Sequence, residues 1–174
     1  MKLGRFGDDR IGVVCGGFVH DVTAAFDVAP SPTNARSRGD VLIAGLERLR
    51  PRLEAACEAA PRLDLASVQW LSPVTSPSRV IAVRTNYGPG AAGSDPDLFV
   101  KSPSSVVGPS EGIELRFPER RTDHEVELVA VVGRACDSVA PAEALDCLAG
   151  YCIGLDVTLR GDEDRALRKS LDGY

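Results

Sequence analysis

The chain is poor in the features that mark several large classes of protein. Only two of its 174 residues are histidine, and no apolar run approaches the roughly 18–20 residues of a membrane span. Its N-terminus lacks the apolar stretch of a secretory signal peptide. No basic stripe accompanies the net charge of −5. We therefore expect neither a membrane nor a nucleic acid as a partner.

Cysteine is present, but not with the spacing of a metal site. The cysteines are odd in number, without a CxxC pair: Cys15, Cys57, Cys136, Cys147 and Cys152. With only His20 and His124 to complete a ligand set, this pattern argues against zinc. Reduced thiols in a cytosol are the simplest interpretation, so we expect a cytoplasmic protein.

The first part of the sequence predicts a small α+β domain. Two short strands are expected on either side of the glycine pair at 16–17. Residues 40–59 carry an apolar face at helical spacing, and Pro51 is expected to kink or divide that helix. Residues 72–78, Ser-Pro-Val-Thr-Ser-Pro-Ser, have the composition of a linker. We therefore place a domain boundary between residues 75 and 76.

The second part, residues 76–174, is expected to be mostly β. The predicted strands are Arg79–Val83, Leu98–Lys101, Ser105–Val107, Ile113–Leu115, Glu125–Gly133 and Tyr151–Thr158. A helix is predicted at Pro141–Ala149, with Pro141 in its first turn. The whole chain is thus predicted to be α+β and mostly β.

Two glutamates, Glu125 and Glu127, stand one residue apart on a predicted strand. Residues i and i+2 of a strand share a face, roughly 6–7 Å apart, while the neighbouring His124 points away. Unpaired carboxylates are expensive to bury on an apolar strand. A divalent cation is the simplest remedy, and such oxygen ligands suit Mg²⁺, Mn²⁺ or Ca²⁺. The alternative is a solvated outer face of an edge strand.

Four segments, in order, resemble the fumarylacetoacetate hydrolase family. They are Ser76–Val83 with Asn86-Tyr87, Leu98–Pro109, Asp123–Leu128 with Val131–Arg134, and Ala149–Thr158 with Lys169–Asp172. The pattern around His20-Asp21-Val22-Thr23 is similar to the small domain that precedes the catalytic domain in many members. The resemblance implies an incomplete mixed β-sheet roll at 76–174 after a small α+β domain at 1–75.

The resemblance also implies a class of chemistry. Members act on 1,3-dicarbonyl or 2-oxo acid substrates as isomerases, tautomerases, decarboxylases, other lyases or C–C hydrolases. They use magnesium or another divalent ion. By the matching motifs, the metal ligands here would be Glu125, Glu127 and Asp156. A small-molecule keto acid is the implied partner.

Three further residues become candidates through the same likeness. Lys169 would hold the substrate carboxylate or the developing enolate, and is the candidate catalytic residue. Tyr87 and Lys101 are candidate substrate contacts beside it. The alternatives are packing for Tyr87, a surface role for Lys101 and an exposed position in a charged tail for Lys169.

Two departures from the family pattern affect the expected activity. Gly90 and Gly93 stand where many members have a histidine and a glutamate that activate water. A positioned general base contributes about 10²–10⁴ in rate, so we expect enolate chemistry rather than hydrolysis. The chain also ends at Tyr174, before the family pattern does. We expect open strand edges. A second copy of the chain, as in a homodimer, or a full-length relative would cover them. The alternative to an enzyme is a non-catalytic partner subunit or a fragment.

Overall fold

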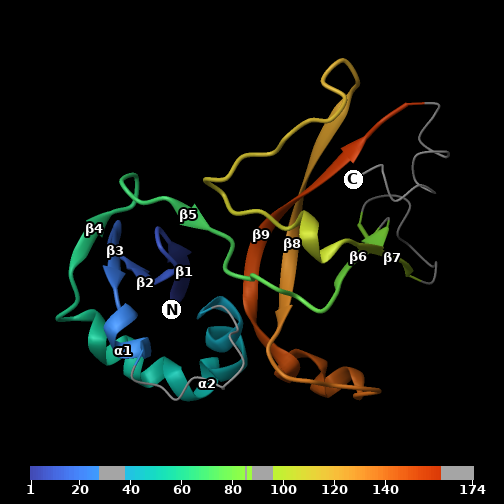
Figure 1. Cartoon of the computed structure of the whole chain (residues 1–174). Helices are drawn as coiled ribbons and strands as arrows, with labels where there is room; N and C mark the ends of the chain where they lie inside the picture. The colour runs from blue at the N-terminus through green and yellow to red at the C-terminus, as the bar shows by residue number, and fades with distance from the viewer. Residues whose placement is uncertain (28–37, 85, 88–95, 162–174) are drawn as a thin grey trace.

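The computed structural model describes residues 1–27, 38–84, 86–87 and 96–161. The first part of the chain contains an antiparallel five-stranded sheet. Its strand order is β4-β3-β2-β1-β5 (Figure 1). The strands are β1 (Lys2–Phe6), β2 (Arg10–Cys15), β3 (Phe18–Asp21), β4 (Arg62–Asp64) and β5 (Trp70–Leu71). Gly16 and Gly17 join β2 to β3 with φ values of 57° and 85°. Two successive positive φ angles are typical of the tight hairpin turn that the glycine pair predicts.

Two helices, α1 (Thr23–Asp27) and α2 (Arg38–Cys57), pack against β2. The buried core between them consists of Ile11, Val13, Val22, Phe26, Leu42, Leu49 and Leu53. The three leucines come from the apolar face of α2 that the sequence predicts. Burial of this face supplies most of the stability that a helix has in a protein.

The helix α2 continues through Pro51 without interruption. Proline removes a backbone donor and crowds the preceding turn, which would favour a break. However, Leu49 and Leu53 on either side of it are only 3% and 0% exposed. Packing of these side chains against the sheet holds the helix together, so the predicted helix is confirmed and its expected division at Pro51 is wrong.

The second part contains two antiparallel strand pairs. The pair of β6 (Val80–Arg84) and β7 (Asp97–Lys101) is short, whereas β8 (Thr122–Val132) and β9 (Leu148–Leu159) are long and curved (Figure 1). These strands confirm four of the six expected in this part. β8 begins earlier than predicted, and β9 extends further at both of its ends. The class, α+β and mostly β, is confirmed as well.

Two predicted strands of the second part are wrong, and its predicted helix is present as a 3₁₀ helix. Ser105–Val107 is not a strand, because a short 3₁₀ helix, η1 (Pro103–Ser105), ends there. The Ser102 hydroxyl caps the start of this helix by accepting a hydrogen bond from the Ser104 amide at 3.3 Å. Residues 113–115 are irregular, without a partner strand in the described ranges. The expected helix at Pro141–Ala149 is a 3₁₀ helix, η2 (Pro141–Cys147), without a side-chain cap at its start.

The second part returns to the first sheet at β5. The Trp70 amide donates to the Ser110 hydroxyl at 2.8 Å, and the Ser110 amide donates to the Trp70 carbonyl at 3.1 Å. At Gly108 an added Cβ would lie 2.4 Å from the Ser72 nitrogen, so only glycine allows this approach. The division into domains at 1–75 and 76–174 stays a prediction.

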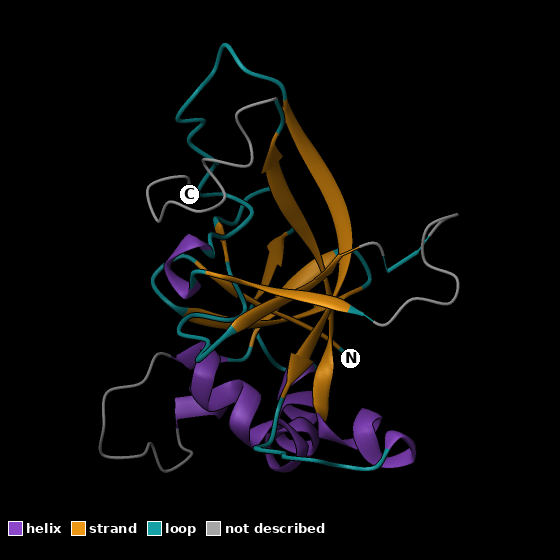
Figure 2. Ribbon diagram, turned by 90° about the vertical axis from the view of Figure 1, so that its right-hand side faces the viewer, coloured by secondary structure: helices purple, strands orange, loops and turns teal. Residues whose placement is uncertain are grey.

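Most of the helices gather at one end of the molecule, and one short helical segment lies apart from them beside the strands (Figure 2). None of the helices in the described ranges has both the length and the apolar character to cross a membrane. On one face of the β8–β9 pair large apolar side chains are exposed, including Leu128 at 74% and Ile153 at 79%. Burial is therefore concentrated in the first part of the chain.

Candidate functional site

The three predicted metal ligands lie on one face of the β8–β9 pair. Glu125 and Glu127 are two residues apart on β8, and Asp156 on β9 stands directly opposite Glu125 in the strand register. Cross-strand neighbours have Cβ atoms about 4.5–5.5 Å apart. Glu127 faces Gly154, where an added Cβ would lie 2.6 Å from the Val129 Cγ2 atom. Strand alternation therefore brings all three carboxylates to one surface.

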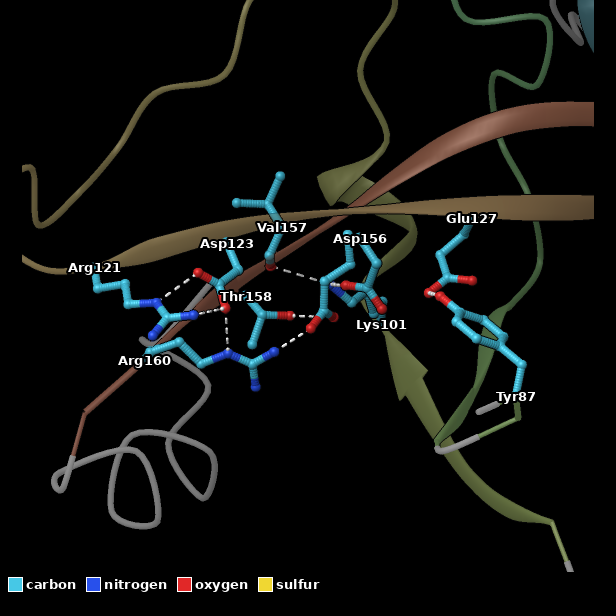
Figure 3. Close-up of polar contacts among 10 residues, drawn as sticks. Tyr87, Lys101, Arg121, Asp123, Glu127, Asp156, Val157, Thr158 and Arg160 are labelled. Carbon is cyan, nitrogen blue, oxygen red and sulfur yellow. Dashed lines mark hydrogen bonds and ion pairs between the residues drawn. The ribbon is translucent and has the colours of Figure 1, made fainter. Parts of the chain in front are cut away.

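Each carboxylate has a different partner in this structure. Figure 3 shows three groups along the strands: Arg160 beside Asp123 and Thr158, Lys101 beside Asp156, and Tyr87 beside Glu127. In the described part of the chain no three His, Cys, Asp or Glu side chains are grouped closely enough to hold a metal ion. The ligand set of Glu125, Glu127 and Asp156 therefore stays a prediction, although all three share a face.

Glu125 is held through both of its carboxylate oxygens. The Thr158 hydroxyl donates to Oε2 at 3.0 Å, and the Arg160 guanidinium forms an ion pair with Oε1. Arg160 also donates from Nε to Asp123 Oδ2 at 3.0 Å. Sequence reasoning missed Thr158 and Arg160. The even spacing from Asp156 to Thr158 and Arg160 was the available signal, because these positions share a strand face.

Asp123 connects two arginines at the outer end of the site. Arg121 donates to its two carboxylate oxygens at 2.8 and 3.0 Å, and Arg160 approaches from the other strand. The hydrogen bonds from Arg121 and Arg160 lower the pKa of Asp123. Asp123 is thus a fixed negative charge between two positive ones.

The Asp156 side chain is 15% exposed, compared with 34% for that of Glu125. The ammonium group of Lys101 forms an ion pair with the Oδ1 atom of Asp156 and also donates to the Val157 carbonyl at 3.4 Å. The Oδ1 atom is buried and accepts no hydrogen bond of good geometry from the described residues. Its polar contact with them is therefore the ion pair with Lys101. A partly satisfied oxygen of this kind has remaining capacity for a cation.

We expect the substitution Lys101→Met to lower the free energy of unfolding by about 1–3 kcal/mol, because it leaves Asp156 with a charge but without this countercharge. The Lys101 side chain is 28% exposed, which keeps the cost below that of a fully buried pair. Urea denaturation at neutral pH in the presence of EDTA measures the change. The double variant Lys101→Met/Asp156→Asn should recover part of the loss; a double variant that is as unstable as the single one would contradict this account.

Glu127 accepts a hydrogen bond from the Tyr87 hydroxyl, at 3.0 Å between Oη and Oε1. This hydrogen bond and the negative charge of Glu127 raise the pKa of Tyr87. Tyr87 is 65% exposed. Its exposure argues against the packing role considered for it, while its substrate contact stays a prediction.

The histidines do not join the carboxylates. His124 lies on the opposite face of β8, as strand alternation predicts, and is exposed. His20 is buried in the first sheet, where its Nδ1 atom lies 2.8 Å from the Cys57 carbonyl oxygen. Lys169, Gly90 and Gly93 lie outside the described residues, so their predicted roles and effects stay predictions.

The carboxylate face borders a large hollow. Its lining includes all three carboxylates together with Tyr87 and Lys101, and its volume is about 2380 Å³. Small-molecule pockets typically have volumes of roughly 300–1,000 Å³. The hollow therefore has room for a keto acid and for further polypeptide.

Comparisons with known proteins agree with the fold. Residues 79–173 match the model of the fumarylacetoacetate (FAA) hydrolase C-terminal family. The maleylpyruvate hydrolase of Aquipseudomonas alcaligenes is 41% identical to the chain, covering 100% of this chain and 67% of its own length.

Solved structures also resemble the whole chain. The maleylpyruvate hydrolase from Sphingobium sp. SYK-6, in complex with manganese(II) ion and pyruvate, has a TM-score of 0.81 at 35% identity. The match covers 100% of this chain and 64% of that one. The fumarylacetoacetate hydrolase from Exiguobacterium antarcticum has a TM-score of 0.74 at 31% identity, with 100% and 63% covered.

The chain thus spans about two thirds of the length of these relatives. Its β-rich second part carries the family match, and its first part aligns with theirs as well. The predicted family is confirmed: the chain belongs to the fumarylacetoacetate hydrolase family.

Proposed function

We propose that the protein is a divalent-metal-dependent enzyme that acts on a 2-oxo acid or a 1,3-dicarbonyl compound. The observation that carries the proposal is the strand register, which sets Asp156 opposite Glu125 and beside Glu127 on one face. The relative with bound manganese and pyruvate supports the same class of ligands. In this proposal Glu125, Glu127 and Asp156 hold Mg²⁺ or Mn²⁺.

The residues suit a hard cation. All three ligands offer carboxylate oxygens, which such ions prefer. The buried Oδ1 atom of Asp156 accepts no well-formed hydrogen bond from the described residues. The bound ion would polarise a carbonyl group and spread the charge of an enolate. The present partners of the carboxylates, Lys101 and Tyr87 among them, would then be released toward the substrate.

The protein's own groups would orient the substrate. Lys101 brings a positive charge to the carboxylate face, where it can bind the carboxylate of a keto acid. Tyr87 offers a hydroxyl group at the rim. Lys169 completes the set in our proposal as the group that stabilises the developing enolate.

The reaction type follows from two opposing indications. Glycine at positions 90 and 93 favours isomerisation, tautomerisation or decarboxylation, which need no activated water. The relatives named above are hydrolases. We propose the enolate reactions as the main activity, with slow hydrolysis of an acylpyruvate as a second one.

We expect the full chain to consume maleylpyruvate or oxaloacetate when Mn²⁺ is present and not when EDTA replaces it. Proton NMR of the products separates the reactions. Hydrolysis converts maleylpyruvate and water into maleate and pyruvate, isomerisation gives the trans isomer, and decarboxylation of oxaloacetate gives pyruvate and carbon dioxide. Metal-independent turnover at the same rate would contradict the proposal.

A second candidate is a non-catalytic subunit that assembles with a second copy or with a longer relative. The exposed apolar side chains of β8 and β9, such as Leu128 and Ile153, favour it. Large exposed apolar patches of this kind mark protein–protein interaction sites. In that case the chain would keep the metal site or only the fold, and alone it would not turn over a keto acid.

A further inference from the structure

Arg160 occupies a distinctive position beside the carboxylate face. Its Nε atom donates to Asp123 Oδ2 at 3.0 Å, while its Nη2 atom forms an ion pair with Glu125 Oε1. One guanidinium therefore joins two carboxylates of β8 from the end of β9. The planar fork of arginine allows this double contact, which a lysine cannot reproduce.

The contacts fix one arrangement of Glu125. Arg160 takes one lone pair on Oε1, and the Thr158 hydroxyl takes one on Oε2 at 3.0 Å. A carboxylate offers about four such acceptor positions. The remaining ones are available to a cation on the face that Asp156 shares.

Arg160 is itself anchored from outside. Asp123 receives Arg160 on Oδ2 and Arg121 on both oxygens, at 2.8 and 3.0 Å. The negative charge of Asp123 offsets part of the repulsion between Arg160 and a divalent ion nearby. Orientation of the ligand then outweighs that repulsion, as it does for outer partners of metal ligands in general.

We propose that Arg160 is a positioning residue that presents Glu125 to the divalent ion. The inference rests on the proposed metal site and adds a group outside its ligand set. Together with Thr158, Arg160 holds the Glu125 side chain in one rotamer. Asp123 in turn holds Arg160 in place.

The test is Mn²⁺ titration of the full chain by isothermal titration calorimetry. Arg160→Met should weaken Mn²⁺ binding about 10–100-fold, the usual effect of losing an outer partner of a ligand. Arg121→Met is the matched control. Arg121 forms its hydrogen bonds and ion pair with the same Asp123, and not with Glu125. It should change the affinity less than about threefold, as expected of an exposed ion pair.

Two more variants keep the test decisive. Arg160→Lys retains the charge without the fork, and should bind Mn²⁺ more weakly than the wild type. Asp123→Asn removes the anchor of Arg160 and should weaken binding in the same direction, even if Arg160→Met fails to fold. Circular dichroism in EDTA verifies the fold of each variant.

The outcomes separate this inference from the proposed function. If the wild type binds Mn²⁺ and Glu127→Gln does not, the metal site exists. In that case, unchanged or tighter Mn²⁺ binding by Arg160→Met would overturn the inference about Arg160 but not the proposed function. Wild-type Mn²⁺ affinity in Arg160→Lys would do the same. If the wild type binds no Mn²⁺, or if Glu127→Gln binds it as well as the wild type, the proposed function fails first.

Discussion

Glu127→Gln is expected to weaken Mn²⁺ binding at least about 100-fold, more than the loss of an outer partner typically does. Glutamine keeps the size of the side chain and still accepts the Tyr87 hydrogen bond through its amide oxygen. It removes the negative charge, which is what a hard divalent cation binds most strongly. Isothermal titration calorimetry of the full chain measures the affinity.

Glu119→Gln is the matched control for this prediction. Glu119 is exposed in the turn before β8 and belongs to neither strand, so its substitution should leave the affinity unchanged. Equal affinity in the wild type and Glu127→Gln would remove Glu127 from the ligand set. The metal-dependent function would then be withdrawn, while membership of the family would be unaffected.

The contacts of Glu125, Glu127 and Asp156 explain how these carboxylates coexist. Two of them face a cation, Lys101 or Arg160, and the third accepts from the Tyr87 hydroxyl. The positive charges replace part of what a divalent ion would supply. Binding of an ion at the proposed site would require Glu127 and Asp156 to turn from Tyr87 and Lys101 toward it. Glu125 would keep its contacts with Arg160 and Thr158, and the shared strand face permits the change because only side-chain rotation is involved.

Much of this site is predictable from the sequence, because strand alternation is a strong rule. The spacing of Glu125 and Glu127 predicts a common face, and the opposite orientation of His124 follows from the same rule. The pairing of Asp156 with Glu125 is harder to predict, since register depends on both strands. The family resemblance supplies that link, and the strand register agrees with it.

The partners of the carboxylates are less predictable. Lys101 reaches Asp156 from β7, and Tyr87 reaches Glu127 from the segment after β6. Long side chains bridge separate elements, so sequence spacing does not reveal these contacts. Local rules also fail at Pro51, where the burial of Leu49 and Leu53 outweighs the usual cost of proline in a helix.

Leu53→Ala is expected to lower the free energy of unfolding by about 2–5 kcal/mol, the usual cost of removing a buried leucine side chain. Leu53 is 0% exposed, and it packs from α2 into a core with Ile11 and Leu49. Urea denaturation followed by circular dichroism measures the loss. It should be large because the described buried core lies almost entirely in this first part of the chain.

Leu46→Ala provides the comparison on the same helix. Leu46 packs against this core but is only partly buried, so its substitution should cost clearly less than that of Leu53. Leu53→Ala should also leave the Mn²⁺ affinity of the folded protein unchanged, because the core cluster includes no residue of β8 or β9 in the described ranges. Loss of stability without loss of affinity would show that the first part supports the fold while the carboxylate face binds independently. A variant that unfolds no more easily than Leu46→Ala would instead mean that fully and partly buried positions on this face of α2 contribute equally.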